Sequence, residues 1–277
     1  HMIMRLEREQ SVKEYLDIMD HRKTEQLIDT LDKVEQNRKE CYIREFSIEH
    51  FHDSKVFETL IPKICKIFRE ENEELTGFEN EEILAEYQIY KTPGYVYMKG
   101  NVQIYSAGKQ AADISAFPEG IAVAVGSEED VPDICPDQTI DKVFTIENLT
   151  SFYRFKQEHS LVIYLGGYHN RSRRNLLMQI YQKLPDAQYY HFGDLDAGGF
   201  YILEHLKRKT GIPFQMFQMD IETLKKYEGY AKPLTENDKK RLMQLEKMEL
   251  PDEERKLITY MLQKGIKLEQ ECISESQ

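Results

Sequence analysis

The sequence predicts an α/β fold, in which a parallel sheet flanked by helices follows a mainly helical module with a β-hairpin. Three observations lead to this prediction. Apolar residues recur at helical spacing through about the first 70 positions, two β-prone runs surround a glycine-containing turn near residue 100, and strands alternate with helices from residue 142 onward. Strands too apolar to be half-exposed, separated by helices, are typical of a parallel sheet covered on both faces.

The helical module is predicted from residues of about 5–40 and from residues 54–70. The apolar stripes of these two segments consist of Leu27, Leu31, Val34, Val56, Leu60, Ile64 and Ile67. Residues 95–98 and 102–105 are the β-prone runs, and Lys99-Gly100-Asn101 between them is a turn sequence. The two runs therefore predict a hairpin, and helices followed by a hairpin suit a winged-helix module.

The second half predicts four strands, at residues 143–146, 161–165, 188–192 and 214–219. Three helices are expected between them, at residues 148–157, 173–184 and 200–209, and the tail from about 221 is expected to be helical. Val131 to Pro136, with two prolines, is interpreted as the connection between the two halves.

Acidic residues follow three of the predicted strands. Glu147 follows the first strand, Asp194 and Asp196 follow the third, and Asp220 is a weaker candidate after the fourth. The carboxyl ends of parallel strands meet at one edge of a sheet, where functional groups gather. Carboxylates that share an edge repel each other unless they are protonated, solvated or bridged by a cation. Their oxygen ligands favour Mg²⁺ or Mn²⁺.

Each of these acids also has an ordinary explanation. An Asp-x-Asp pair is common by chance, and a glutamate after a strand often stabilises the start of a helix. The order of the motifs is the stronger signal: Glu147 after the first strand, Gly166-Gly167 after the second, and Asp194-Leu195-Asp196 after the third. This order predicts a metal site.

Composition excludes several classes of protein. Hydrophobic residues make up 40% and charged residues 31% of the 277 positions, which is typical of a folded chain. A net charge of −12 argues against a protein that coats nucleic acid through a general positive field. The apolar runs are far shorter than the ~20 residues of a membrane helix, so no membrane contact is expected. The four cysteines are widely spaced and fit no disulfide framework, which favours a cytoplasmic protein.

Residues 143–149, 165–167 and 193–200 together resemble a Toprim domain. More narrowly, the chain resembles the JetD nuclease family of bacterial Wadjet anti-plasmid systems, relatives of the A subunit of topoisomerase VI. Further matching segments lie at residues 44–48, 53–55, 233–235 and 267–271, so the resemblance covers roughly residues 44–272.

The resemblance implies three parts: residues 1–43 as a helical segment, interpreted as a truncated arm, 44–136 as a winged-helix (CAP-like) DNA-binding module, and 137–277 as a Toprim catalytic domain with carboxyl-terminal helices. It implies a homodimer that grips double-stranded plasmid DNA beside a condensin-like SMC–kleisin complex. It also implies phosphodiester hydrolysis, with Glu147, Asp194 and Asp196 holding one or two Mg²⁺ or Mn²⁺ ions. Glu147 is in addition a candidate general acid or base.

Basic residues for the DNA backbone are few. Arg171, Arg173 and Arg174 follow the second strand at the same edge as the acids and are candidate phosphate clamps, although charges at a helix start also aid solubility. Lys99 at the expected hairpin tip is the candidate contact of the wing with a DNA groove.

Three other functions remain open. Relatives of the topoisomerase VI A subunit cut DNA through a tyrosine, and Tyr42 lies in the corresponding region. A Toprim fold that only clamps DNA is the second alternative, although the three acids are all present. A nucleotide-sugar site built on Asp194-Leu195-Asp196 ranks last, because it leaves Glu147 unexplained.

Overall fold

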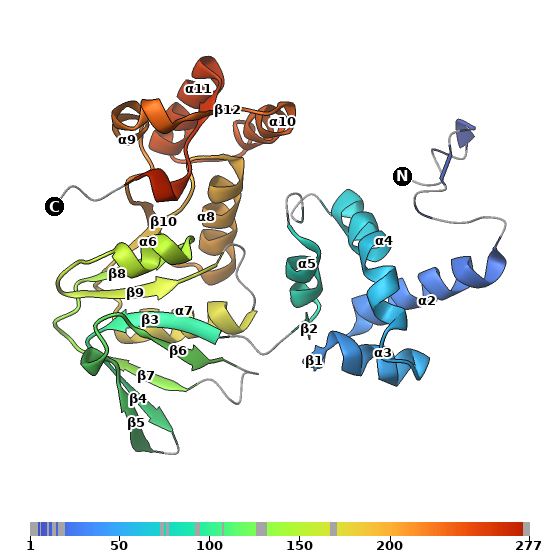
Figure 1. The fold of residues 1–277 in the computed structure, drawn as a ribbon, viewed down its shortest axis with the longest axis horizontal. Coiled ribbons are helices and arrows are strands. Elements are labelled where there is room, and N and C mark those ends of the chain that lie inside the picture. The colour runs from blue at the N-terminus through green and yellow to red at the C-terminus, as the bar shows by residue number, and fades with distance from the viewer. Residues whose placement is uncertain are drawn as a thin grey trace. The chain divides into compact units, whose positions relative to one another are not determined.

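The structure is a computed structural model of the chain. It describes residues 5, 7–9, 11, 12, 15, 20–72, 75, 78–91, 95–106, 108–125, 132–166 and 171–273, with the backbone alone for residues 171 and 172. The chain forms two compact units, His1–Pro93 and Gly94–Gln277 (Figure 1). No helix among the described residues is long and apolar enough to span a membrane.

The first unit is mainly helical, as the sequence predicts. Its described elements are α2 (His21–Gln36), β1 (Cys41–Tyr42), α3 (Ile43–Phe51), α4 (Val56–Glu71), α5 (Asn80–Glu86) and β2 (Ile89–Tyr90). The side chain of Asp20 caps α2 by accepting a hydrogen bond from Lys23 N, which satisfies a backbone donor of the first turn. Leu27 and Val34 from α2 and Ile64 and Ile67 from α4 are buried, so these residues of the predicted stripes lie in the core, whereas Leu31, Val56 and Leu60 are half-buried.

A six-stranded sheet forms the centre of the second unit. Its strands are, in order across the sheet, β11 (Gln215–Met216), β10 (Gln188–Phe192), β8 (Lys142–Ile146), β9 (Ser160–Tyr164), β3 (Tyr95–Gly100) and β6 (Ile121–Ala124). The first four run parallel to one another, which confirms the predicted parallel arrangement. β3 and β6 extend the sheet by antiparallel pairing, so the sheet as a whole is mixed.

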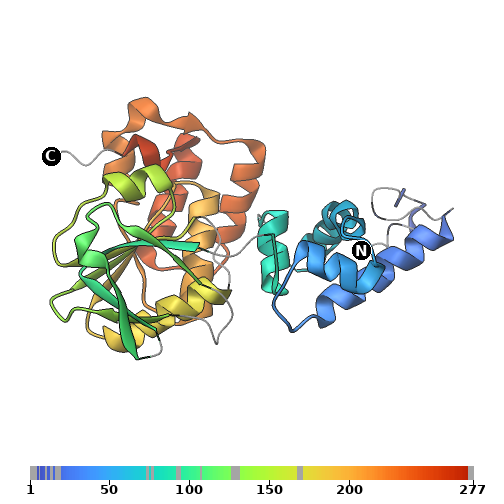
Figure 2. The same ribbon diagram turned by 60° about the horizontal axis from the view of Figure 1, so that its bottom comes forward.

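Helices cover both faces of this sheet. They are α6 (Leu149–Arg154), α7 (Arg171–Lys183), α8 (Ala197–Thr210), α9 (Ile221–Lys226), α10 (Glu236–Leu245) and α11 (Asp252–Lys264). Figures 1 and 2 show α6 and α7 on opposite sides of the sheet. Alternate residues of each strand face the same side, and Phe144, Val162 and Phe192 share a core with residues of α6, α8, α10 and α11.

Two smaller sheets complete the second unit. One contains β5 (Lys109–Asp113), β4 (Val102–Ser106) and β7 (Asp133–Pro136). The short 3₁₀ turn η2 (Ile114–Ala116) follows β5 directly in the chain. The other pairs β12 (Lys232–Pro233) with β13 (Ile266–Lys267), which lies just before the 3₁₀ turn η4 (Gln270–Cys272). A further 3₁₀ turn, η3 (Glu228–Tyr230), precedes β12.

The predicted hairpin between residues 95–98 and 102–105 is wrong. β3 pairs with β9 and β6, whereas β4 pairs with β5 and β7, so the two strands belong to different sheets. The chain bends at Asn101 instead of reversing, and each strand satisfies its hydrogen bonds elsewhere. The antiparallel turn lies one strand later, between β4 and β5, next to Gly108 with φ +73°. The expected boundary at residue 136 consequently falls inside the second unit.

Gly100 makes the switch from one sheet to the other possible. Its φ of +140° lies in a region that residues with side chains rarely adopt. A β-carbon at this position would stand 2.5 Å from Ser160 O and 3.2 Å from Leu161 Cα, because β9 runs directly beside it. A side chain here would therefore push β3 away from β9.

We predict that Gly100→Ala lowers the free energy of unfolding of the second unit by more than about 1 kcal/mol, because strain and overlap both act on the folded state. Gly229→Ala is the matched control, since no atom lies within 4 Å of its β-carbon position and its φ is not positive. Urea denaturation of both variants measures the effect. Equal stability of the two variants would contradict the role given to Gly100.

Candidate functional site

The site is built by the parallel pairing of β8 with β10. Ile146, the last residue of β8, lies opposite Phe192, the last residue of β10. Glu147 N donates to Phe192 O at 3.0 Å, which continues the ladder one step beyond the strands. The carboxylate of Glu147 then reaches Asp194, whose backbone N lies 3.4 Å from Glu147 Oε2. Two of the three predicted acids, separated by 47 positions in sequence, are thus brought together.

Gly193 leaves room for this approach. A β-carbon on Gly193 would stand 2.6 Å from Glu147 Oε2 and 2.9 Å from His191 Nε2. Any side chain at this position would displace the Glu147 carboxylate. The absence of a side chain between the two strand ends therefore belongs to the site as much as the acids do.

His191 is a part of the site that the sequence analysis did not identify. It is fully buried, and Nδ1 lies 3.0 Å from Thr145 Oγ1, while Nε2 has no hydrogen-bond partner among the described residues. Burial lowers the pKa of His191 to about 3, so the imidazole is neutral. A histidine among the aromatic residues of this strand is the available signal, but sequence alone does not show which face it occupies.

The Asp194 carboxyl group is mostly removed from solvent. The pKa of Asp194 is raised to about 6, mainly by burial. The charges of Asp196, Glu271 and Glu269 contribute to this increase, and a hydrogen bond from Gln270 N opposes it. Gln270 N donates to Asp194 Oδ1 at 2.7 Å. Asp194 therefore carries an uncompensated negative charge at neutral pH, which a bound cation would stabilise.

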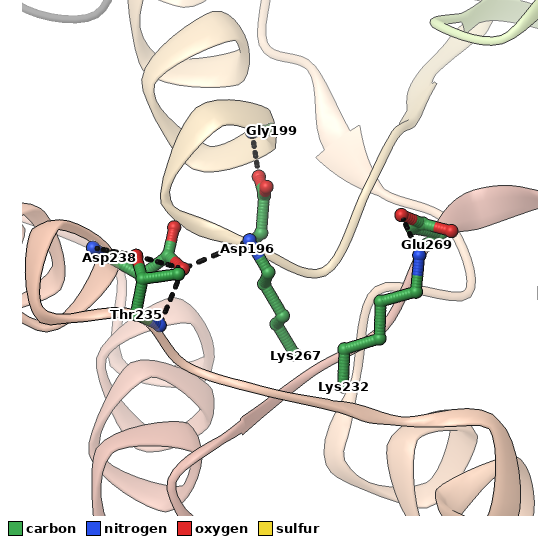
Figure 3. A network of polar contacts seen from close by, with 7 residues as sticks. All are labelled: Asp196, Gly199, Lys232, Thr235, Asp238, Lys267 and Glu269. Carbon is green, nitrogen blue, oxygen red and sulfur yellow. Dashed lines mark hydrogen bonds and ion pairs between the residues drawn. The ribbon is translucent and has the colours of Figure 1, made fainter.

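Asp196 lies close in sequence but its carboxylate has a different contact. Oδ1 accepts a hydrogen bond from Gly199 N at 2.9 Å and caps α8, as Figure 3 shows. Gly199 packs against the backbone of Asp194, and a β-carbon there would overlap Asp194 O. The glycines of Ala197-Gly198-Gly199 thus allow α8 to begin directly beside the site.

Among the residues that the structure describes, no group of three or more His, Cys, Asp or Glu side chains is arranged to hold a metal ion. The donor set nevertheless fits Mg²⁺ or Mn²⁺ in part: the Glu147 carboxylate lies against the backbone N of Asp194, so two oxygen-bearing acids come from adjoining strand ends. Asp196 could join them only if its carboxylate left Gly199 N. Asp220, the weaker candidate, caps α9 by accepting from Thr223 N at 2.7 Å, which is the ordinary role of an acid at a helix start.

The carboxyl-terminal segment closes one side of the site. Leu268 and Leu195 exchange two backbone hydrogen bonds, Leu195 N to Leu268 O at 2.9 Å and Leu268 N to Leu195 O at 3.1 Å. Figure 3 shows the ion pairs that secure this segment, Lys267 with Asp238 at 2.9 Å and Lys232 with Glu269 at 2.5 Å. Residues 267–271, which match a family motif in sequence, thus lie beside Asp194 in the structure.

The four predicted DNA contacts lie in different environments. The side chain of Arg171 lies outside the described part of the structure. Arg173 donates to Leu165 O at 2.8 Å and to Tyr95 O at 3.5 Å, which ties α7 to the end of β9 and to β3. Arg174 is 9% exposed, and burial of this extent argues against a direct contact with phosphate.

The expectation for Lys99 is wrong. Lys99 lies within β3 and is 7% exposed, not at a wing tip. Its ammonium group donates to Phe152 O at 2.6 Å and Tyr153 O at 3.3 Å, and it lies 4.9 Å from the ring centroid of Phe152. These carbonyls belong to the last turn of α6, where a positive charge is favourable. Lys99 therefore fixes α6, which follows directly after Glu147 and Asn148.

Tyr42, the candidate nucleophile of the alternative mechanism, lies in β1 of the first unit. Its backbone N donates to Glu45 Oε2 at 2.8 Å at the start of α3. Tyr42 is thus the residue that caps the start of α3.

The second unit is an α/β domain with acidic side chains at the carboxyl ends of its parallel strands. Glu147 and Asp194, together with the acids around them, form a candidate cation-binding rim. A sequence model of the family described as "Wadjet protein JetD, C-terminal" matches residues 129–277, more than half of the chain. The chain belongs to this family.

A curated relative, the Wadjet protein JetD of Bacillus cereus (strain Q1), is 29% identical over 254 residues. The aligned part covers 90% of this chain and 61% of the relative, so the chain spans about three fifths of the length of that protein. The similarity extends beyond the family match into the first unit.

We predict that Asp194→Asn stabilises the metal-free protein at pH 7.5 by on the order of 1 kcal/mol. The pKa of Asp194 is higher in the folded than in the unfolded chain, so protonation favours folding; this contribution is complete below about pH 4 and is lost as the pH rises through about 6. The stability difference between variant and wild type should therefore grow between pH 4 and pH 7. Urea denaturation across this range, with the exposed Asp186→Asn as control, measures it. A difference that is independent of pH would contradict the raised pKa.

We predict that Lys99→Met lowers the free energy of unfolding by about 1–3 kcal/mol, because the two carbonyls at the end of α6 lose a charged donor. The matched control is Lys109→Met, an exposed lysine in β5. Thermal and urea unfolding measure the loss. Unchanged stability together with weaker DNA binding would instead restore the interpretation of Lys99 as a DNA contact.

Proposed function

We propose that this chain is a metal-dependent DNA endonuclease subunit of a Wadjet defence system, which hydrolyses phosphodiester bonds of double-stranded plasmid DNA. The observation that carries the proposal is the hydrogen bond from Asp194 N to Glu147 Oε2, which joins the carboxyl ends of β8 and β10 in a chain of the JetD family. Under this proposal the second unit is a Toprim domain. The helical first unit serves as a DNA-binding module of the winged-helix type, without the hairpin expected at residues 95–105.

The proposed ligands of Mg²⁺ or Mn²⁺ are Glu147 and Asp194, with Asp196 joining if its carboxylate turns from Gly199 N. A bound divalent ion supplies Lewis acidity, which lowers the pKa of a water molecule and neutralises charge on the phosphate. Glu147 is also a candidate proton acceptor or donor, because its carboxylate lies at the carboxyl end of β8 beside the Asp194 backbone. Asp194, held by Gln270 N, keeps its oxygen atoms in a fixed orientation.

The acidic rim also sets a condition on substrate binding. DNA is a polyanion, and Glu147, Asp194, Asp196, Glu269 and Glu271 would repel it at neutral pH. A divalent ion at the rim would remove this repulsion as well as support the chemistry. We therefore propose that DNA binding at the rim and cleavage both require the metal.

The partners proposed for the chain are a second copy of itself and a condensin-like SMC–kleisin complex. The name of the Bacillus cereus relative places that relative in a Wadjet system, and this chain is similar to it over 90% of its own length. A homodimer would present two rims to the two strands of a duplex. Control by the complex would protect the host genome from unrestrained cutting.

A second candidate function is a DNA-clamping subunit without catalytic activity. The orientation of Asp196 favours it, because this carboxylate caps α8 instead of facing the other two acids. Such a protein would bind plasmid DNA with the same fold but would leave every phosphodiester bond intact.

Cleavage of supercoiled plasmid in Mg²⁺, Mn²⁺ or EDTA tests the proposal, with the chain alone and with its Wadjet partners added. We expect metal-dependent linear or nicked products, and a loss of more than about 100-fold in Glu147→Gln and Asp194→Asn. Asp186→Asn, an exposed acid away from the rim, should cut like wild type.

Each contrary result points to a different function. Equal cutting in EDTA and Mg²⁺ would overturn the metal mechanism. DNA ends that enter a gel only after protease treatment would indicate a covalent tyrosine enzyme, which Tyr42→Phe would then test. DNA binding without cutting, in the complete system with metal, would indicate the clamping subunit.

A further inference from the structure

We infer that Gln270 is a positioning residue, which holds the two neighbouring acids of the rim in register from outside the parallel sheet. The inference rests on the proposed metal site at Glu147 and Asp194. It assigns a function to the carboxyl-terminal segment around η4, which contributes no predicted ligand.

The Gln270 side chain connects the ends of both strands. It is fully buried; Oε1 accepts from Asn148 N at 2.9 Å and Nε2 donates to Phe192 O at 3.1 Å. Asn148 directly follows Glu147, and Phe192 O also accepts from Glu147 N. The Gln270 amide thus accepts from the backbone N–H of Asn148 after β8, and it donates to the Phe192 carbonyl at the end of β10, which also accepts from Glu147 N.

The Gln270 backbone contacts the second acid directly. Its N–H donates to Asp194 Oδ1 at 2.7 Å, and this donation opposes the effect of burial on the carboxylate. The side-chain bonds fix where the backbone of Gln270 lies, and the backbone bond then fixes the Asp194 carboxylate. A substitution of the side chain should therefore act on Asp194 even though the backbone N–H remains.

The chemistry of the contact explains why the residue is a glutamine. The position needs one donor for Phe192 O and one acceptor for Asn148 N at the end of a side chain of this length. A glutamate would provide no donor and would place another charge beside Asp194. A methionine would fill the same space without either hydrogen bond.

Contacts on either side of Gln270 keep the segment folded against the sheet, while the Gln270 side chain sets the position of its own backbone between them. Leu268 pairs with Leu195 through two backbone hydrogen bonds, and Asn148 Nδ2 donates to Glu271 Oε1 at 2.5 Å. These contacts remain when the Gln270 side chain is changed. The expected effect of a Gln270 substitution is accordingly a change in the geometry of the carboxylates within a folded protein.

Titration of the purified, full chain with Mn²⁺, followed by electron paramagnetic resonance, tests the inference without depending on catalysis. We expect Gln270→Met to weaken the Mn²⁺ site of the wild type by about 10–100-fold, the range typical of residues that orient metal ligands. Gln263→Met, an exposed glutamine on α11, is the matched control and should bind like wild type.

Gln270→Asn keeps both hydrogen-bonding groups on a side chain one methylene shorter, so it cannot reach Asn148 N and Phe192 O together. We expect Gln270→Asn to weaken Mn²⁺ binding as well. If circular dichroism shows that Gln270→Met does not fold, Gln270→Asn serves as the test in its place. Wild-type affinity in a folded Gln270 variant would overturn the inference alone. A wild-type protein that binds no Mn²⁺ at the rim would overturn the proposed metal site and the inference with it.

Discussion

The parallel pairing of β8 with β10 is the constraint on which the candidate site depends. The pairing fixes Ile146 opposite Phe192, and every later contact of the rim follows from this register. Glu147 continues the ladder through Phe192 O, Gly193 leaves space for its carboxylate, and Asp194 lies beside it. Because side chains alternate along a strand, a shift by one residue would turn Glu147 to the other face of the sheet.

The rim brings together negative charge that the apo protein tolerates only at a cost. Burial of Asp194 and the nearby acids raise its pKa, and Gln270 N is the contact that partly offsets this. Such a site is stabilised by a proton at low pH or by a cation at neutral pH. The same electrostatics link stability to the proposed function, since an amide at position 194 would relieve the repulsion but remove a proposed metal ligand.

Much of this architecture could be predicted from sequence. The helices of the first unit, the four parallel strands and the meeting of Glu147 with Asp194 follow from local periodicity and from the rule that parallel strands share a carboxyl edge. The partners of β3 could not be predicted, because its hydrogen bonds go to β9 and β6, which lie far away in the sequence. The burial of Lys99 and the contacts of Gln270 depend on the same long-range packing. Asp196 shows the limit for single residues: its sequence position fits a ligand and a helix cap equally well.

The proposed function requires that Glu147 and Asp194 bind one divalent cation between them. The most direct test is anomalous diffraction from crystals of the chain grown or soaked in Mn²⁺, since it locates the ion without relying on activity. We expect an anomalous peak at the carboxyl ends of β8 and β10, with carboxylate oxygens of both residues bound to the ion. Saturating Mn²⁺ that produces no peak at this edge, or one held by other residues, would rule out the proposed metal site.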